Sequence, residues 1–308
     1  MIPRWMRNVF IKTLLFFQTC LSRIAWALGP LCVVVAFGLI FMVTFVYFTT
    51  ILPHYISTKY LGLLSLFHIF NAVWLAFNLP FNYFMCISTS PGFTEKESVD
   101  RSQISEEEYE YDYCNYCRAL KPERAHHCTV CDRCTLRMDH HCPWMANCVG
   151  HFNYKYFVLF LLYMTVSCFY VAAMGSLPQK YGGLPPKVKA PYFGSTAVEF
   201  SVLLCISVGL AVGAMLVWHL FLIATQQTTI EFYQNQMMKR HARKHNREWV
   251  NIYDINIRKN FDAVFGNDSL WWRWLIPSTK PPPGDGRSFW VREDVKLIRK
   301  DNTGTFAI

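Results

Sequence analysis

Four long runs of apolar residues dominate this sequence and limit what it can fold into. The clearest is LCVVVAFGLIFMVTFVYFTTIL, residues 31–52, which carries no charge and is followed by Pro53. A helix rises about 1.5 Å per residue, so roughly 20 apolar residues are enough to cross the hydrocarbon core of a bilayer. The other three runs of this length lie at about 61–85, 154–174 and 198–224. The sequence therefore predicts an all-α polytopic protein that crosses a membrane four times.

The lysine and arginine residues predict which side of the membrane each loop faces. Of the 30 in the chain, 26 lie in the N-terminal segment, around the loop between the second and third spans, or in the C-terminal tail. Loops rich in Lys and Arg stay in the cytosol. We therefore expect both termini and the loop at 87–153 to be cytosolic, and the net charge of +9 to attract anionic membrane lipid. No recognisable nucleic-acid-binding motif accompanies that charge, so no nucleic acid partner is expected.

The N-terminal segment allows two interpretations. Residues 9–21 are mostly apolar after a basic start, and AWA at 25–27 resembles the cleavage site of a signal peptide. However, Lys12 interrupts the apolar run and Arg23 lies just before the proposed site. The distribution of positive charge also opposes the reversed topology that cleavage would produce. We therefore expect residues 9–21 to form a helix at the membrane interface.

Seven of the twelve cysteines fall between positions 114 and 148, in the predicted cytosolic loop. An odd number of cysteines in a reducing compartment argues against disulfides and favours metal binding. Pairs separated by two residues occur at 114/117, 128/131 and 131/134, a spacing that lets two thiolates reach one tetrahedral zinc ion. Two structural zinc ions need eight ligands, and the loop offers more than eight. The candidates are the seven cysteines and His126, His127, His140, His141 and His151.

The surplus of candidates includes a group with the chemistry of a thiol enzyme. Cys142 closely follows Asp139 and His140. A histidine can take the proton of a thiol while an acid orients that histidine. Neighbouring side chains often point apart, however, and Cys142 could instead be a metal ligand like the cysteines around it. On these residues alone, the catalytic and the metal-binding interpretations both stay open.

Several motifs in and around this loop occur together in one known family. They are CNYC at 114–117, KPERAHHC at 121–128, CDRC at 131–134, MDHHCPWMANCVG with NYKYF at 138–157, QTTIE at 227–231 and NFDAVFG at 260–266. In order and sequence they resemble the cysteine-rich domain, the TTxE motif and the C-terminal aromatic motif of the DHHC family of membrane protein S-acyltransferases, commonly called palmitoyltransferases. The resemblance covers roughly residues 30 to 266 and includes the four-span topology.

The resemblance implies two structural zinc ions, each bound by three cysteines and one histidine. The first set is Cys114, Cys117, His127 and Cys134, and the second is Cys128, Cys131, His141 and Cys148. Cys142 is then the nucleophile, with His140 as its base and Asp139 holding His140 in the correct tautomer. The implied reaction is ping-pong. A long-chain acyl group, palmitoyl above all, passes from fatty acyl-CoA to Cys142 and then to a cysteine thiol of a target protein at the cytosolic face.

The resemblance also suggests where the acyl donor lies. Lys121, Arg124 and His126 are candidates for binding the CoA head group, because basic side chains can pair with phosphates. The acyl chain is expected in a cavity lined by all four spans, where Ser167 is small enough to leave depth for a long chain. Ordinary solvated charge is the alternative for the basic residues, and helix packing is the alternative for Ser167.

The predicted organisation has five parts. They are a cytosolic or interfacial N-terminal segment at 1–30, the first two transmembrane helices at 31–86, a cytosolic two-zinc cysteine-rich domain at 87–153, the last two transmembrane helices at 154–225, and a cytosolic C-terminal domain at 226–308. In the tail, the resemblance implies that Thr228, Thr229 and Glu231 dock the chain against the active-site loop and that Asn260 fixes the fourth helix.

The modest length of the spans favours the endoplasmic reticulum or the Golgi over the plasma membrane. Two other functions compete with acyl transfer. A non-catalytic membrane adaptor would use the zinc loop to grip partners, but the intact Asp-His-His-Cys sequence disfavours it. A ubiquitin ligase of the zinc-domain type would leave one cysteine unused beside Asp-His. The sequence indicates neither the target proteins nor an accessory subunit.

Overall fold

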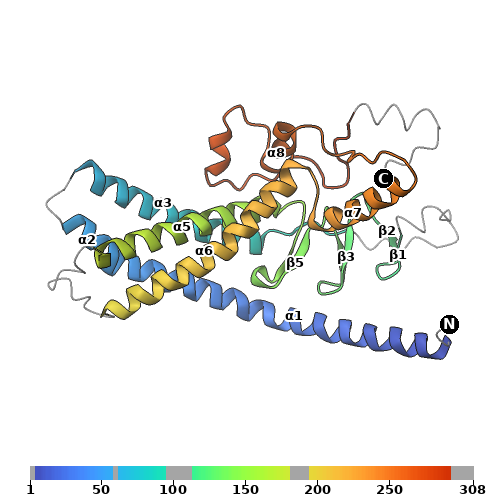
Figure 1. Cartoon of the computed structure of the whole chain (residues 1–308), viewed down its shortest axis with the longest axis horizontal. Helices are drawn as coiled ribbons and strands as arrows, with labels where there is room; N and C mark the ends of the chain where they lie inside the picture. Colours follow the sequence, from blue (N-terminus) through green and yellow to red (C-terminus); the bar gives the residue numbers. More distant parts are fainter. Residues whose placement is uncertain (1–3, 58–61, 95–112, 181–193, 293–308) are drawn as a thin grey trace.

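The computed structural model describes residues 4–57, 62–94, 113–180 and 194–292. Within these residues, four helical segments are long and apolar enough to span a membrane. They belong to α1 (Arg4–Val46), α3 (Leu63–Ser88), α5 (Tyr154–Lys180) and α6 (Gly194–Ala224), with η1 (Tyr47–Ile51) and α2 (Leu52–Ser57) continuing α1. The C-terminal part of α1 lies in a bundle with the other three (Figure 1). This confirms the predicted four-span architecture.

Helix α1 is longer than the sequence predicted. It runs from Arg4 to Val46 without a break and contains Pro30. Residues 9–21 are helical, as expected, and they form the first part of α1. Their place at the membrane interface stays a prediction. In space, this part of the helix lies alongside the cysteine-rich domain (Figure 1). The contact is close at Gly29, where a Cβ would lie 3.0 Å from the Cβ of Ala146. The sequence gives no sign of this contact, since the two residues are far apart along the chain.

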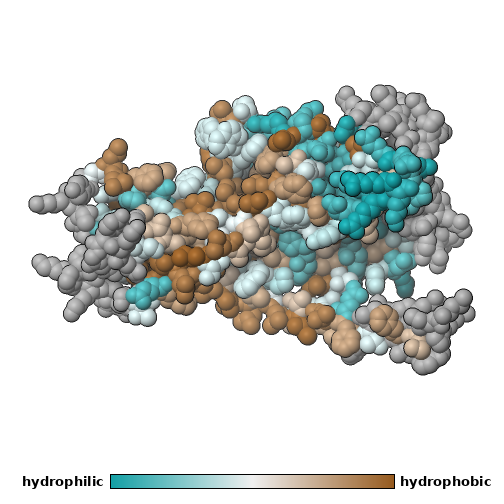
Figure 2. Space-filling model, viewed as in Figure 1, coloured by the Kyte–Doolittle hydropathy of each residue, from teal (hydrophilic) through white to brown (hydrophobic). Residues whose placement is uncertain are grey.

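Close packing between α5 and α6 depends on small residues. A Cβ added to Gly209 would lie 3.1 Å from the Cβ of Cys168, and one added to Gly213 would lie 3.3 Å from Thr165. Small residues let two helix backbones approach, which holds helices together where lipid removes the hydrophobic drive for association. Hydrophobic side chains gather over the bundle, and hydrophilic ones gather at the opposite end of the molecule around α7 (Thr229–Lys244) (Figure 2).

The cysteine-rich domain consists, in its described part, of three antiparallel hairpins. Their strands are β1 (Tyr113–Cys114) with β2 (Ala119–Leu120), β3 (His126–Cys128) with β4 (Arg133–Thr135), and β5 (His140–Cys142) with β6 (Asn147–Val149). A 3-10 turn, η3 (Pro143–Met145), forms the tip of the third hairpin. These strands are short, and most of the described residues lie in helices. The structure as a whole is therefore mostly helical, as predicted. Residues 95–112 of the predicted domain lie outside the described residues.

Two asparagines fix the third hairpin to the end of α3. The side-chain amide of Asn147 donates to the carbonyl oxygens of Ile87 and Thr89, both at 3.2 Å. The side-chain amide of Asn153 donates to the carbonyls of Cys86 at 3.3 Å and Cys148 at 2.8 Å. Because α3 belongs to the bundle, these bonds place the third hairpin directly over the end of the bundle.

The C-terminal domain follows α6 and contains α7, α8 (Ile257–Phe265) and η4 (Trp271–Leu275). Helix α7 begins with a capping box, in which the Thr228 hydroxyl accepts from the amide of Glu231 and the Glu231 carboxylate accepts from the amide of Thr228. The side-chain amide of Asn260 on α8 donates to the carbonyl of Ala224, the last residue of α6, at 2.8 Å. This bond fixes α8 to the end of the fourth span.

Candidate metal centres and thiol site

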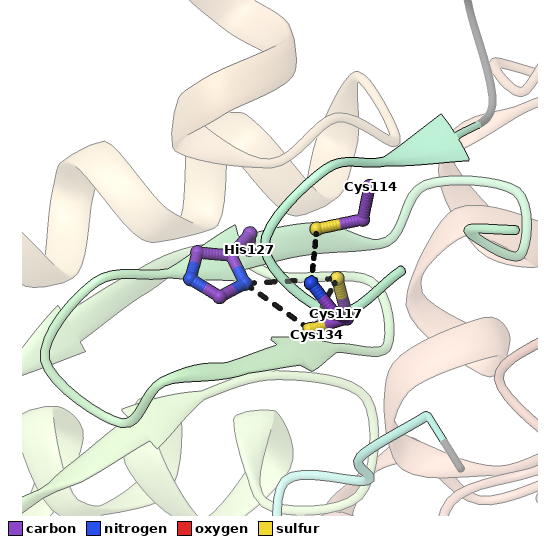
Figure 3. A group of neighbouring side chains, drawn as sticks. All are labelled: Cys114, Cys117, His127 and Cys134. Carbon is purple, nitrogen blue, oxygen red and sulfur yellow. Dashed lines mark hydrogen bonds between the residues drawn. The ribbon is translucent and has the colours of Figure 1, made fainter. Parts of the chain in front are cut away.

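Eight cysteine and histidine side chains form two tight groups. The first is Cys114, Cys117, His127 and Cys134 (Figure 3), and the second is Cys128, Cys131, His141 and Cys148. Within each group, the four possible ligand atoms all lie within 4.8 Å of one another. The structure thus brings together the same residues that the sequence analysis assigned to each set.

The spacing within the groups suits a tetrahedral metal ion. In the second group, the sulfur atoms of Cys131 and Cys148 are 3.4 Å apart. The Nδ1 atom of His141 lies 3.4 Å from the Cys131 sulfur and 3.7 Å from the Cys128 sulfur. Ligands at about 2.3 Å from a tetrahedral centre lie roughly 3.7 Å from one another, and three thiolates with one imidazole are a common structural donor set. Each group could therefore hold one metal ion.

Each group also joins two hairpins. The tip of the first hairpin supplies Cys114 and Cys117, whereas His127 and Cys134 face each other across β3 and β4. The tip of the second hairpin likewise supplies two cysteines of the second group, and facing positions on β5 and β6 supply the other two ligands. The hairpins are thereby linked in series, and the last of them carries Cys142.

A repeat of 14 residues underlies this arrangement, and the sequence analysis missed it. Cys114, Cys128 and Cys142 follow one another at 14-residue steps, each at the end of the first strand of its hairpin. In the first two tips, a second cysteine comes three residues later, but in the third tip that position holds Met145. The Met145 side chain is 1% exposed and packs in the hydrophobic core. Cys142 therefore begins a turn of the metal-binding type that lacks its second thiol.

The backbone repeats with the sequence. The residues that close the three tips are Arg118, Asp132 and Ala146, with φ of 54°, 51° and 47°. This left-handed region is uncommon for residues other than glycine. The third tip is closed by a backbone hydrogen bond from Ala146 N to Pro143 O at 3.1 Å. The third turn thus keeps the shape of the other two, although its thiol belongs to neither metal group.

An imidazole and a carboxylate lie beside this thiol. His140 Nδ1 donates to Asp139 Oδ2 at 2.7 Å, which leaves the other ring nitrogen to interact with Cys142. Burial alone would lower the pKa of His140, but its hydrogen bonds with Asp139 and Cys142 raise this pKa to about 9. The His140 ring can therefore accept a proton from a neighbouring thiol and hold it.

The chain segment after α6 holds Asp139 in place. Asp139 Oδ1 accepts from the amide of Thr229 at 2.8 Å, and Oδ2 accepts from the Thr229 hydroxyl at 2.9 Å. Asp139 is 1% exposed. Burial would raise its pKa, but the hydrogen bonds from His140 and Thr229 hold that pKa below its usual value. The carboxylate therefore stays ionised and can orient His140.

His219 is a polar residue of the site that the sequence analysis did not name. It lies on α6, and its ring is 5.9 Å from the ring of His140. Its Nδ1 atom is 3.1 Å from the hydroxyl oxygen of Tyr154. With Asp139 and His140 it forms a third group of possible ligand atoms, which contains no thiol. The signal that could have identified His219 is a histidine inside an apolar span, since such polar residues are rare and often functional.

A cavity of about 400 Å³ lies within the bundle, and Cys142 is in its wall. Its lining is almost entirely apolar and comes from α1, η1, α3, α5, α6, β5 and η3. The volume falls within the range of roughly 300–1,000 Å³ typical of small-molecule sites. Ser167 is one of the lining residues, and its hydroxyl is buried with no hydrogen-bond partner among the described residues. The cavity therefore has the four-span wall expected from the sequence.

Arg124 does not have the surroundings expected of a CoA contact. Its Nε and NH2 groups donate to the two carboxylate oxygens of Glu231, both at 2.6 Å, and its guanidinium lies 4.2 Å from the ring centroid of Tyr253. The side chain is 3% exposed. A buried guanidinium that is already paired favours a structural role for Arg124, and its role as a CoA contact stays a prediction. His126 is partly buried, and the role of Lys121 and His126 as CoA contacts stays a prediction.

Comparison with known proteins gives consistent matches. Residues 107–236 match the family model described as DHHC palmitoyltransferase. The chain is 35% identical over 185 residues to probable protein S-acyltransferase 15 of Arabidopsis thaliana, an alignment that covers 59% of this chain and 70% of that protein. It is 33% identical over 271 residues to probable protein S-acyltransferase 13 of the same species, with 80% and 84% covered. It is 28% identical over 322 aligned positions to palmitoyltransferase ZDHHC16A of Danio rerio, with 86% and 80% covered.

Proposed function

The chain belongs to the DHHC palmitoyltransferase family and is a protein S-acyltransferase, and from this premise we propose that Cys142 carries the acyl group as a covalent intermediate. The observation that carries the proposal is the position of one thiol. Cys142 lies in the wall of the apolar cavity, interacts with His140 and is outside both metal groups. It therefore combines access to an acyl chain with a base that can take its proton.

In the first half-reaction, the proposed donor is a long-chain fatty acyl-CoA. His140 takes the proton of the Cys142 thiol, and the thiolate attacks the thioester carbonyl. A bond forms between the Cys142 sulfur and the acyl carbon, and the bond from that carbon to the CoA sulfur breaks. The CoA thiolate leaves with the proton that His140 held. Asp139 keeps the ring in the tautomer that this exchange requires.

The second half-reaction reverses these roles. A cysteine thiol of the target protein gives its proton to His140, and its sulfur attacks the acyl carbon on Cys142. The Cys142 sulfur then leaves, takes the proton back from His140 and is ready for another cycle. Both steps exchange one thioester for another, so catalysis depends on the placement of the thiols and on an available thiolate. The overall course is ping-pong.

The acyl chain is proposed to lie in the 400 Å³ cavity. Leaving a C16 chain in water would cost about 0.8 kcal/mol per methylene, so an apolar cavity next to the nucleophile favours a palmitoyl donor. Ser167 would lie along the chain, where its small side chain leaves room. A site within the membrane also suits this chemistry, because the proposed acyl donor and the acylated target both carry a fatty acyl chain.

The two metal groups are proposed to hold zinc. Zinc bound by three thiolates and an imidazole has no free coordination position and stabilises the fold of small domains that lack a large core. In this chain, the described core of the hairpins is small and consists largely of the ligating cysteines themselves. The ligands would therefore fix the third hairpin, and Cys142 with it, relative to the bundle.

The distribution of Lys and Arg supports an active site that faces the cytosol. We propose that the targets are proteins with a cysteine near the cytosolic face of the endoplasmic reticulum or the Golgi. The basic loops would also favour anionic lipid around the enzyme.

The test is the Cys142→Ser variant of the full chain. Incubated with a clickable palmitoyl-CoA, it should form no hydroxylamine-sensitive acyl-enzyme and transfer no label to a cysteine peptide, while native mass spectrometry still finds two metal ions. Cys20→Ser is the matched control and should behave as wild type, because Cys20 belongs neither to the metal groups nor to the cavity wall. A thioester label that survives in Cys142→Ser would contradict the proposal. Loss of one metal ion would instead assign Cys142 to a metal site.

A further inference from the structure

A second cavity, of about 140 Å³, lies between the cysteine-rich domain, the end of α6, α8 and the tail. It shares no lining residue with the apolar cavity that contains Cys142. The charged and polar groups in its wall include Arg124, Arg137, Gln226 and Lys259. Arg124 is already paired with Glu231, so Arg137 and Lys259 are the two cations of this wall that have no acidic partner among the described residues.

Arg137 lacks a partner suited to its charge. The residue is 5% exposed. Its NH2 group donates to the side-chain oxygen of Gln226 at 2.8 Å, and its guanidinium carbon lies 5.2 Å from the ring centroid of Tyr154. Among the described residues, no carboxylate lies within ion-pair distance of it. A guanidinium has five N–H groups to satisfy, and one neutral amide oxygen leaves most of them without an acceptor among the described residues.

The nearest acidic groups are already committed to other partners. Both carboxylate oxygens of Glu231 accept from Arg124. Both carboxylate oxygens of Asp139 accept from Thr229, and one also accepts from His140. A buried charge is strongly unfavourable unless it is paired. The pKa of Arg137 reflects this situation, because burial and then the charge of Arg124 lower it to about 10.

We propose that this second cavity binds a phosphate-class dianion, with Arg137 as its main ligand and Lys259 as a second cation at the mouth. The tetrahedral oxygens of a phosphate can accept two parallel N–H bonds from one guanidinium. The volume of about 140 Å³ is large enough to admit a phosphate group. The phosphate is either free in solution or the exposed monoester of a lipid head group.

Such an anion would add a further link between parts of the chain that hydrogen bonds such as Thr229 to Asp139 already connect. Arg137 belongs to the cysteine-rich domain and Lys259 to α8, and Gln226 lies in the segment that leads to Thr229. Thr229 in turn holds Asp139. The anion site is therefore a positioning device that ties the tail to the domain carrying the nucleophile, in addition to the proposed acyl transfer.

The test uses the full-length protein in detergent with its metals retained. The probe is inorganic phosphate, compared with sodium chloride at equal ionic strength. Thermal unfolding is followed by tryptophan fluorescence, and affinity is measured by isothermal titration calorimetry. Wild type should show a saturable rise in the unfolding midpoint, and Arg137→Gln should weaken phosphate binding by about tenfold or more. Arg240→Gln removes the same charge from an exposed position on α7 and should leave the affinity unchanged.

Two further measurements are needed. One uses a variant that keeps Arg137, in case Arg137→Gln folds poorly, and the other distinguishes a free phosphate ion from a lipid head group. Lys259→Gln leaves the buried guanidinium in place and should weaken binding by about threefold, a loss of the size expected for one exposed charge. Nanodiscs with phosphatidylinositol 4-phosphate replace inorganic phosphate in a parallel series, with phosphatidylcholine nanodiscs as reference. Stabilisation by inorganic phosphate supports a free ion, and stabilisation by the phosphoinositide alone supports a lipid head group. No stabilisation by either, or equal affinity in wild type and Arg137→Gln, overturns the proposal. Cys142→Ser should bind phosphate as wild type does, so failure of the acyl-transfer mechanism would leave this result intact.

Discussion

The hydroxyl of Thr229 gives a prediction whose size follows from the geometry. Thr229→Val keeps the shape of the side chain but removes the bond to Asp139 Oδ2, which is 2.9 Å long. The backbone amide of residue 229 still donates to Oδ1 at 2.8 Å. A hydrogen bond to a charged group contributes about 1.5–3 kcal/mol. If Asp139 orients His140 during proton transfer, losing that amount from the transition state slows the reaction by roughly 10- to 150-fold.

The measurement is single-turnover formation of the acyl-enzyme from palmitoyl-CoA, followed by steady-state transfer to a cysteine peptide. The rate of acyl-enzyme formation should fall in Thr229→Val, whereas the apparent affinity for palmitoyl-CoA should stay unchanged, because Thr229 is not in the cavity wall. Thr229→Ser keeps a hydroxyl and should recover most of the rate. Thr165→Val is the matched control, because the Thr165 hydroxyl donates to the carbonyl of Leu161 on its own helix and makes no contact with Asp139.

Two results would refute this reasoning. A wild-type rate in Thr229→Val would mean that the hydroxyl does not contribute to the orientation of Asp139. An equal loss in Thr229→Val and Thr229→Ser would mean that packing, not the hydrogen bond, is responsible. Metal content is measured on each variant, so that a disturbed metal group is not mistaken for a disturbed contact between Asp139 and His140.

Four further predictions follow from other contacts. Arg124→Met should lower the free energy of unfolding by about 3–5 kcal/mol because it leaves Glu231 buried and unpaired, and adding Glu231→Met should recover most of the loss in chemical denaturation. Ser167→Phe fills part of the cavity, so competition among C14, C16 and C18 acyl-CoA should shift toward the shorter chains. Chelation should release two metal ions, detected by mass spectrometry, and should abolish acylation of Cys142 as the hairpins open. Burial lowers the pKa of His151 from 6.5 to about 4. The stability that neutral His151 contributes is therefore complete above about pH 6.5 and is lost as the pH falls toward 4. His151→Gln should lose less stability over this pH range, as measured by chemical denaturation.

The spans and the metal groups could be predicted because their signals are local. Residues 31–52 need only be long and apolar to identify a span. The pairs at 114/117 and 128/131 bring their own two thiols together within one turn. The remaining ligands follow once the resemblance supplies the pairing, as His127 with Cys134 illustrates. In each case, the property that matters is carried by a few neighbouring residues.

Other features could not be predicted because they depend on contacts across the fold. The extension of α1 past Pro30 places Gly29 against the cysteine-rich domain, which no local pattern reports. Arg124 has the guanidinium group that a phosphate contact needs, but this group is already paired with the carboxylate of Glu231 from the start of α7. His219 is separated from His140 by the whole of α5 along the chain, and only the packing of α6 makes them neighbours. A basic or polar side chain shows its role only when its partner is known.

The repeat of 14 residues explains how one sulfur of the seven comes to lie outside both metal groups. The first two turns of the repeat each end in a second cysteine, and each turn is completed by a histidine and a cysteine from the next hairpin. The third turn has Met145 in place of its second cysteine, and the chain continues into α5 rather than into a fourth hairpin. Cys142 therefore keeps the fixed backbone of a metal-binding turn without the metal. The Met145 side chain turns into the bundle, so the same substitution that removes the ligand also anchors the turn beside the apolar cavity. Two bound metals would then hold the proposed nucleophile rigidly without taking part in the reaction.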